Sequence, residues 1–161
     1  MKVFVFIAIA ALLLYSFLTQ KWFPPLVVMK KRGCDPKGCG AYGASRDGGT
    51  RIHKGFDVRA RKGETVRAPI SGMVSVFGTS TGLTGVGISN SAEKAKVIYI
   101  TPKVRTGENV KRGQVIGYAQ DITVVYGAEM TNHIHLESII GGVNINPEKK
   151  LGPIASITSN A

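Results

Sequence analysis

The stretch that decides how this chain folds is Asn132-His133-Ile134-His135-Leu136-Glu137. In a β-strand, successive side chains point to opposite faces, so His133, His135 and Glu137 share one face. Ile134 and Leu136 then point the other way, toward a core. In a helix the two histidines would diverge by about 200° and could not act together. The stretch therefore predicts a strand that carries two imidazoles on its polar face.

A second motif, at residues 53–57, reads His53-Lys54-Gly55-Phe56-Asp57. In an extended segment this spacing places the imidazole and the carboxylate on the same face. The chain has only three histidines, and all three lie in these two motifs. Two histidines, one aspartate and an open fourth position suit a catalytic Zn²⁺ ion, which acidifies water for attack on a carbonyl. The alternative is that these are ordinary surface or strand histidines.

From residue 33 onward, short apolar runs alternate with turn signals. The runs cover residues 65–68, 72–77, 86–89, 96–100 and 115–118. Strands that recur about every 8–12 residues with glycine between them are typical of antiparallel sandwiches and barrels. No long stretch has the helical period. The sequence therefore predicts an all-β fold, a compact antiparallel sandwich or barrel-like domain over 40–147, with a loose C-terminal tail over 148–161.

The order of the motifs resembles the lysostaphin-type peptidoglycan metallopeptidases. The first motif is followed by the pattern Gly63-x-x-Val66-x-Ala68-Pro69-x-x-Gly72-x-Val74. Further along the chain come Val110-x-x-Gly113-Gln114-x-Ile116-Gly117 and then the H-x-H with Asn146-Pro147. The resemblance covers roughly residues 40–147 and includes both histidine motifs in the family's order.

This resemblance implies a zinc metalloendopeptidase, a hydrolase with one Zn²⁺ held by His53, Asp57 and His135. It implies that His133 assists catalysis by handling protons or by steadying the transition state. It also implies that the substrates are the short peptide cross-bridges or stem peptides of bacterial cell walls.

One position departs from the family pattern. The active peptidases carry a further catalytic histidine in a Tyr-x-His, and the matching stretch here reads Tyr99-Ile100-Thr101. We therefore expect Thr101 to stand in the place of that histidine, and the chain has no spare histidine to replace it. General acid–base help is worth about 10²–10⁴-fold in rate, so its loss could cripple the enzyme while the metal stays bound. Tyr99, Tyr126 and Glu129 are the groups that could compensate.

The two cysteines of the chain, Cys34 and Cys39, enclose Asp35-Pro36-Lys37-Gly38. Proline and glycine in so short a gap favour a tight turn, which brings two Cα atoms within reach of a disulfide. Two free thiols are the alternative. A disulfide would indicate an oxidising compartment.

The same segment, Cys34-Asp35-x-x-Gly38-Cys39-Gly40-x-Tyr42, is similar to the leukocyte cell-derived chemotaxin 2 family. These secreted vertebrate proteins share the fold and the zinc site but are generally regarded as signalling proteins without peptidase activity. The resemblance supports the Cys34–Cys39 disulfide. It also implies an alternative function, a catalytically inactive zinc-binding module that binds glycan, peptide or a receptor. A structural membrane or virion component is a third possibility.

Residues 3–18 form an apolar run without a charged side chain. A helix over this run would be about 24 Å long, slightly short of the roughly 30 Å hydrocarbon core of a bilayer. Residues 19–23 close the gap if Lys21 snorkels and Trp22 lies at the headgroups. The sequence therefore predicts a transmembrane anchor over 1–23, followed by a linker over 24–39 that contains the cysteine turn. A signal peptide or an ordinary buried helix is the alternative.

The side of the membrane that the domain occupies is judged from two conflicting signals. Lys30, Lys31 and Arg32 follow the apolar run, and the positive-inside rule would keep the domain in the cytoplasm. The cysteine pair favours an oxidising, extracytoplasmic compartment, and this is the location we expect. A small lytic-type domain on an anchor also fits the membrane of a lipid-containing phage virion.

The formal net charge is +11, with 21 Lys and Arg against 10 Asp and Glu. This excess indicates attraction to anionic wall polymers or lipid headgroups, and the alternative is an ordinary solvated basic surface. No recognition-helix pattern or platform of stacking aromatics appears, so nucleic-acid binding is not expected. The expected partners are therefore peptidoglycan peptides, the lipid bilayer through the N-terminal helix, and other membrane or virion proteins.

Overall fold

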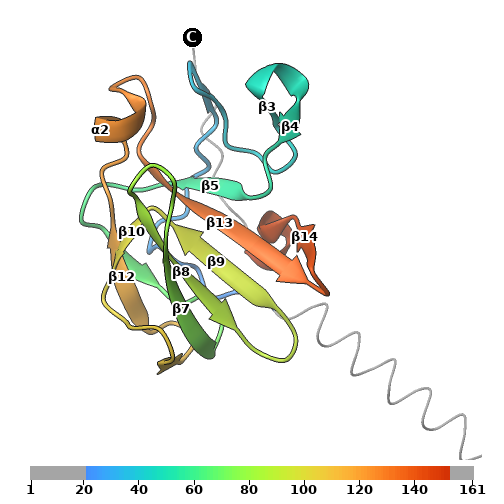
Figure 1. Ribbon diagram of the computed structural model, residues 1–161, viewed down its shortest axis with the longest axis vertical. Coiled ribbons are helices and arrows are strands. Elements are labelled where there is room, and N and C mark those ends of the chain that lie inside the picture. Colours follow the sequence, from blue (N-terminus) through green and yellow to red (C-terminus); the bar gives the residue numbers. More distant parts are fainter. Residues whose placement is uncertain (1–20, 153–161) are drawn as a thin grey trace, which may run out of the picture.

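The computed structural model describes residues 21–152 and shows a mostly β domain (Figure 1). Its main sheet has seven strands in the order β11-β7-β8-β9-β13-β14, with β5 paired to β13. The strands are β5 (Phe56–Arg59), β7 (Gly72–Gly78), β8 (Thr84–Ser89), β9 (Lys94–Ile98), β11 (Asn109–Val110), β13 (His133–Ile140) and β14 (Val143–Ile145). Their pairings are antiparallel, so the β fold predicted from the spaced apolar runs is confirmed.

Smaller elements surround the main sheet. A three-stranded sheet contains β10 (Ile100–Pro102), β12 (Val115–Ala119) and β6 (Thr65–Arg67), in that order. Two hairpins pair β1 (Cys34–Asp35) with β2 (Gly38–Cys39), and β3 (Ser45–Arg46) with β4 (Arg51–Ile52). The short helices are η1 (Asp47–Gly49), α2 (Thr123–Tyr126) and η2 (Pro147–Lys150). Figure 1 shows α2 and the β3–β4 hairpin at the same end of the domain, near β5 and β13.

Strand β13 is the centre of the main sheet because it pairs with β5, β9 and β14. Ile134 and Leu136 are fully buried, as the alternating pattern predicts. Burial of each such side chain stabilises the fold by about 1.5–3 kcal/mol. The register sets His135 opposite Asp57 on β5 and opposite Ile98 on β9. Strand pairing alone therefore brings the two histidine motifs together.

The segment that precedes the first hairpin packs onto the domain. Trp22 and Leu26 are 2% and 1% exposed and belong to the core. The Trp22 indole donates to Glu93 Oε2 across 3.1 Å, and the Pro25 carbonyl accepts from the backbone N–H of Arg67 across 2.9 Å. The prediction that Trp22 lies at membrane headgroups, before a linker, is therefore wrong. The sheet offers these side chains both apolar burial and hydrogen-bond partners.

The chain also packs beyond residue 147, where a loose tail is predicted. The Asn146 side chain accepts from the backbone N–H of Glu148 across 3.0 Å and caps η2. Lys150 and Leu151 are buried, and the Lys150 carbonyl accepts from the Trp22 backbone N–H across 2.8 Å. The predicted tail is wrong for these residues, because they close against the N-terminal segment. Residues 153–161 lie outside the described residues.

The predicted transmembrane anchor falls mainly on residues 1–20, which lie outside the described residues. Between residues 21 and 152, no helix combines the length and apolar character needed to cross a bilayer. The anchor stays a prediction from the sequence.

Cys34 and Cys39 form a disulfide that closes the β1–β2 hairpin, in agreement with the prediction from their spacing. Asp35, between them, accepts from the backbone N–H of Thr131 across 2.9 Å. It also accepts from the backbone N–H of Lys37 across 2.9 Å. The hairpin is thereby fixed beside the residues that lead into β13.

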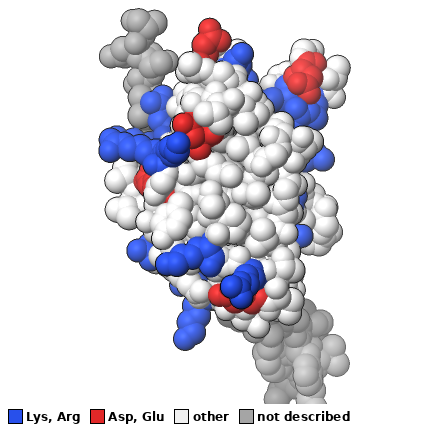
Figure 2. Space-filling model, turned by 60° about the vertical axis from the view of Figure 1, so that its left-hand side comes forward, with Lys and Arg blue, Asp and Glu red and all other residues white. Residues whose placement is uncertain are grey.

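The positive charge of the chain is spread in groups. Figure 2 shows one face of the domain, on which Lys and Arg side chains lie in several separate clusters with broad uncharged surface between them. A continuous basic surface is therefore not a feature of this face.

Candidate metal centre

Three candidate ligands meet where β5 lies against β13. Asp57 lies on β5, His135 lies opposite it on β13, and His53 lies four residues before Asp57. His135 Nδ1 lies 2.9 Å from His53 Nε2 and 2.9 Å from Asp57 Oδ1. His53 Nε2 lies 3.3 Å from Asp57 Oδ1. Ligands about 2.0–2.1 Å from a tetrahedral zinc ion are roughly 3.3–3.4 Å apart, so these three atoms fit a zinc ion.

The glycine of the first motif allows this close approach. A Cβ atom on Gly55 would lie 2.3 Å from the Leu136 carbonyl oxygen and 2.4 Å from His135 Nε2. Any larger residue would push β13 away from the segment that carries His53. The H-x-G-x-D spacing is thus explained by the packing of one backbone against another.

Hydrogen bonds on the outer side of each ring orient the histidines. His53 Nδ1 donates to the Ala41 carbonyl across 2.8 Å, and a carbonyl only accepts, so the Nε2 lone pair faces the centre. His135 Nε2 donates to Glu137 Oε1 across 3.4 Å, and Lys96 Nζ holds that carboxylate from 2.7 Å. The Nδ1 lone pair of His135 then faces the centre. Such outer partners are typical of metal-ligating histidines.

Asp57 is held by a buried arginine. Arg32 Nη1 donates to Asp57 Oδ2 across 2.9 Å, and both side chains are at most 3% exposed. Arg32 is itself held by Asp35, at 2.6 Å and 3.0 Å. Burial raises the pKa of Asp57, but its close contacts with the rings of His135 and His53 outweigh burial and lower this pKa well below its usual range. Asp57 is therefore an anion, as a metal ligand must be.

The sequence does not identify Arg32 as part of the site. It groups Arg32 with Lys30 and Lys31, as charge that flanks a membrane span. The guanidinium is instead 3% exposed and lies at the base of the metal centre. Its partner Asp57 is distant along the chain, and no local pattern could have indicated the pair.

His133 lies beside the three candidate ligands without being one of them. Its Nδ1 donates to the Thr131 carbonyl across 2.7 Å, which leaves Nε2 as the acceptor, 3.4 Å from Asp57 Oδ2. Burial lowers the pKa of His133, so the ring is neutral near pH 7. A neutral imidazole next to a metal centre can accept a proton from water.

Tyr99 faces the histidines from the opposite wall. Its ring centroid lies 5.4 Å from that of His133, and the rings meet edge to face. Tyr99 has a φ of 69°, which costs a non-glycine residue of the order of 1–3 kcal/mol. Hydrogen bonds to the Thr84 carbonyl and from the Gln120 backbone N–H, both 2.8 Å, hold this conformation. Burial raises the pKa of Tyr99, so its hydroxyl, 3.4 Å from that of Tyr126, stays an O–H donor.

Thr101, which the family pattern sets in the place of the missing histidine, lies outside the cleft. Thr101 is exposed on β10, where it pairs with Tyr118, and it is not among the residues that line the cleft. Ile98 and Tyr99 line that wall instead. The reason is the positive φ of Tyr99, which turns the chain from β9 into the second sheet. Thr101 is carried away from the histidines by this turn.

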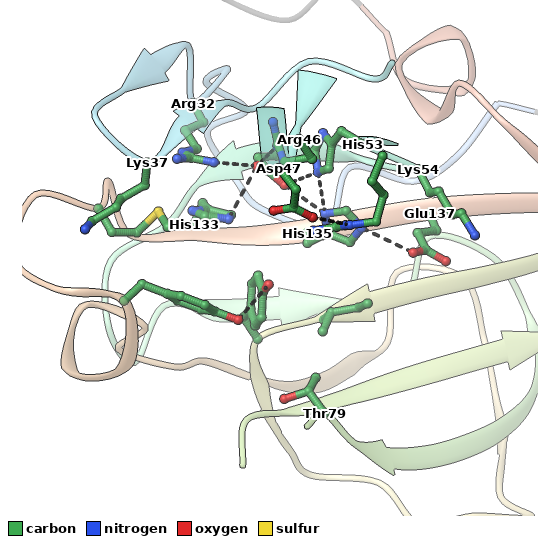
Figure 3. Close-up of a pocket in the computed structure, with 16 residues that line it drawn as sticks. Arg32, Lys37, Arg46, Asp47, His53, Lys54, Thr79, His133, His135 and Glu137 are labelled. Carbon is green, nitrogen blue, oxygen red and sulfur yellow. Dashed lines mark hydrogen bonds and ion pairs between the residues drawn. The ribbon is translucent and has the colours of Figure 1, made fainter. Parts of the chain in front are cut away.

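The metal centre opens into a cleft of about 460 Å³. Figure 3 shows His133 and His135 side by side along β13, with Arg46 and His53 close to them and Thr79 on the opposite wall. The volume lies within the range of about 300–1,000 Å³ that is typical of ligand-binding clefts.

Comparisons with known proteins agree with this geometry. The model of peptidase family M23 matches residues 51–147. The chain is 32% identical to leukocyte cell-derived chemotaxin-2 of Bos taurus over 112 residues, which are 66% of this chain and 72% of that protein. It is 37% identical to myeloid protein 1 of Gallus gallus over 113 residues, and it spans only 34% of the length of that protein.

Solved structures agree as well. The catalytic domain of the prophage-encoded M23 protein EnpA from Enterococcus faecalis, solved as a point mutant, matches with a TM-score of 0.57 and 25% identity. That match covers 81% of this chain and 96% of the EnpA domain. The catalytic domain of lysostaphin from Staphylococcus simulans has the same fold, with a TM-score of 0.53, 22% identity and coverage of 67% and 86%. Both resemblances inferred from the motifs are confirmed.

Proposed function

The chain belongs to peptidase family M23, and from this premise we propose that it is a zinc metalloendopeptidase that cleaves peptide bonds of bacterial peptidoglycan. One observation carries the proposal. The candidate ligand atoms of His53, Asp57 and His135 lie 2.9–3.3 Å from one another. The neutral imidazole of His133, which is not a candidate ligand, lies against the same Asp57 carboxylate. A purely structural zinc site would use a fourth protein ligand instead of leaving a neighbouring base free.

His53, Asp57 and His135 would hold the zinc ion. Zinc supplies Lewis acidity, which polarises the scissile carbonyl and acidifies water at neutral pH. The chain's own contribution is to keep the three metal-ligating atoms deprotonated and aligned. Arg32 and Glu137 do this by fixing the outer side of Asp57 and of His135.

His133 would move the proton. In its neutral form Nε2 accepts a proton from the attacking water as the new C–O bond forms. The protonated ring then gives that proton to the amine nitrogen as the C–N bond breaks. Thr131 keeps the ring aligned throughout, because the Nδ1–H donates to its carbonyl in both protonation states.

Tyr99 would supply a hydrogen bond from the opposite wall. Its hydroxyl remains protonated, so it can donate to the oxygen on which negative charge develops. The held positive φ fixes the ring before substrate binds. This is the support for a working site although the chain contains no fourth histidine.

A second candidate is a catalytically inactive zinc module that binds glycan, peptide or a receptor. The similarity to leukocyte cell-derived chemotaxin-2 and the lack of a fourth histidine favour it. The two candidate functions share the metal centre and differ in whether the protein, with His133 as proton carrier, hydrolyses a peptide.

For location, we propose an extracytoplasmic domain on a single N-terminal anchor that ends before Trp22, in a cell envelope or in the membrane of a phage virion. The Cys34–Cys39 disulfide supports an oxidising compartment. The apolar run at residues 3–18 supports the anchor. Protease added to the outside of intact membranes tests the orientation, because it should digest an extracytoplasmic domain and leave a cytoplasmic domain intact.

Zymography on purified cell walls tests the activity. Wild type should clear the wall in the presence of zinc, while His135→Ala and a chelator-treated sample should not. If wild type clears no wall under any metal condition, yet binds close to one zinc per chain, the inactive module is the function. Fewer than about 0.2 zinc per chain after metal-replete preparation would reject the metal centre itself.

A further inference from the structure

Cationic side chains surround the cleft in excess. Five Lys and Arg residues line it against three carboxylates; the cations are Arg32, Lys37, Arg46, Arg51 and Lys54, and the carboxylates are Asp47, Asp57 and Glu137. A bound zinc ion would add two further positive charges.

Each of the three carboxylates already has a cationic partner. Asp57 pairs with Arg32 at 2.9 Å, and Glu137 pairs with Lys96 at 2.7 Å. Asp47 pairs with Arg51 at 2.8 Å. The remaining cations of the cleft are therefore not neutralised by its own acids.

The uncompensated ammonium groups are those of Lys37 and Lys54. Figure 3 shows them at opposite ends of the row formed by His133 and His135. Among the described residues, Lys54 forms no ion pair. Lys37 lies 3.8 Å from Glu129, but both side chains are more than 40% exposed. Solvent-exposed pairs of this kind contribute little, so both lysines can bind another anion.

Between these lysines lies Arg46. Its Nη2 donates to the Cys39 carbonyl across 2.6 Å, which fixes the guanidinium without neutralising it. It is 4.0 Å from Asp57 Oδ2, an oxygen already bound by Arg32. The cleft thus carries more cationic than anionic side chains between Lys37 and Lys54. Low-dielectric walls focus the field of such charges on a bound ligand.

We infer that this cleft selects acidic peptides, and that Lys37 and Lys54 determine the selection by pairing with peptide carboxylates on either side of the metal centre. The inference rests on the proposed function and narrows its substrate class. Peptides that carry free carboxylates, as wall stem peptides do, gain from these contacts. A neutral glycine cross-bridge gains nothing from them.

Binding of two matched peptides to the zinc-loaded full chain tests the inference. The probes are acetyl-Gly-Gly-Glu-Gly-Gly-amide and the same peptide with Gln in place of Glu, with affinity measured by calorimetry at low salt. Wild type should bind the acidic peptide about five-fold more tightly, and the preference should shrink as salt is added. The variant Lys37→Gln/Lys54→Gln should bind both peptides equally.

A matched control variant separates local pairing from overall charge. Lys103→Gln/Lys149→Gln removes the same two charges from positions that do not line the cleft. It should keep the full preference. Direct binding of the glutamate side chain to zinc is tested by the Lys37→Gln/Lys54→Gln variant, because that contact, and the preference that it causes, would persist there.

Charge reversal gives an independent outcome. Lys54→Glu should prefer a peptide with Lys in place of Glu. Equal affinity of wild type for the acidic and neutral peptides, or no measurable binding of either, overturns the inference. So does a preference that survives the Lys37→Gln/Lys54→Gln change.

Cleavage of the same peptides, followed by mass spectrometry, distinguishes this inference from the proposed function. If the acidic peptide binds more tightly but neither peptide nor purified wall is cut, the proposed peptidase function is rejected and the selection of acidic peptides is supported. If both peptides are cut with equal KM and bound with equal affinity, the selection of acidic peptides is rejected and the proposed peptidase function is supported.

Discussion

Arg32 donates to Asp57 Oδ2 across 2.9 Å, and this contact leaves Oδ1 as the oxygen that faces His53 and His135. A carboxylate offers two oxygens, and the ion pair assigns one of them to the protein and the other to the metal centre. The segment that precedes the disulfide hairpin is therefore part of the site, although the family match begins only at residue 51.

The first prediction concerns this ion pair. Arg32→Met should lower the free energy of unfolding of the metal-free protein by about 3 kcal/mol, because it leaves a buried, uncompensated carboxylate. Urea unfolding measures the change. Zinc should restore part of the stability, because it binds only the folded state. Arg59→Met is the control, since Arg59 donates to the Arg32 carbonyl and not to a carboxylate. A loss below about 0.5 kcal/mol, that of an ordinary surface change, would contradict this account of the pair.

The second prediction separates the two histidines of β13. His133→Asn should lower kcat on cell walls by about 10²–10⁴-fold while zinc content stays near one per chain. His135→Asn should lose the zinc. Both are measured on the same preparations by hydrolysis of dye-labelled wall and by elemental analysis. Loss of zinc in His133→Asn would show that His133 is a ligand and would remove it from its proposed role.

The third prediction concerns the tyrosine wall. Tyr99→Phe keeps the ring against His133 but removes the donor, so kcat should fall by about 10²-fold with little change in melting temperature. Tyr126→Phe is the matched control: it removes the neighbouring hydroxyl, 3.4 Å away, and should have a smaller effect. Equal activity of wild type and Tyr99→Phe would mean that Tyr99 only shapes the cleft.

The fourth prediction is a pH dependence of stability. Burial raises the pKa of Asp35, but hydrogen bonds from Arg32, Thr131 and Lys37 outweigh it and hold this pKa at about 2. Since the unfolded value is higher, about 3.9, the carboxylate stabilises the fold above about pH 4, and this contribution is lost as the pH falls toward about 2.

The variant Asp35→Asn isolates that contribution. Wild type should be more stable than the variant by about 1 kcal/mol at about pH 7, after allowance for solvent screening. The difference should shrink between about pH 4 and pH 2, and comparison with the variant cancels the other carboxylates, which titrate in both proteins. Urea unfolding at neutral pH and at several values down to about pH 2.5 measures it. A difference that does not change over this range would mean that Asp35 acts through its shape alone.

The central strand and the grouping of the candidate ligands could be predicted from the sequence, for a physical reason. The period of two in His133-Ile134-His135-Leu136 fits only a strand with one buried face, and the chain has no other histidines outside the first motif. Register then pairs His135 with Asp57. That these residues bind zinc stays a prediction until the metal is measured.

Other features depend on contacts that no local pattern records. Trp22 lies next to an apolar run, so it resembles an interfacial anchor, yet its indole bonds to Glu93, which is remote in sequence. The family pattern sets Thr101 in the place of a catalytic histidine, yet Thr101 does not line the cleft, because Tyr99 has a positive φ and turns the chain out of β9. Long-range pairing and a single backbone conformation decide these positions.

The central claim is that the metal centre hydrolyses peptide bonds of the cell wall with His133 as the proton carrier. The most direct measurement is the release of new amino groups from purified peptidoglycan by zinc-loaded wild type and by zinc-loaded His133→Asn. The account predicts steady release by wild type, and release at least about 10²-fold slower by the variant at equal zinc content. No release by zinc-loaded wild type, or the same rate from both proteins, would contradict it.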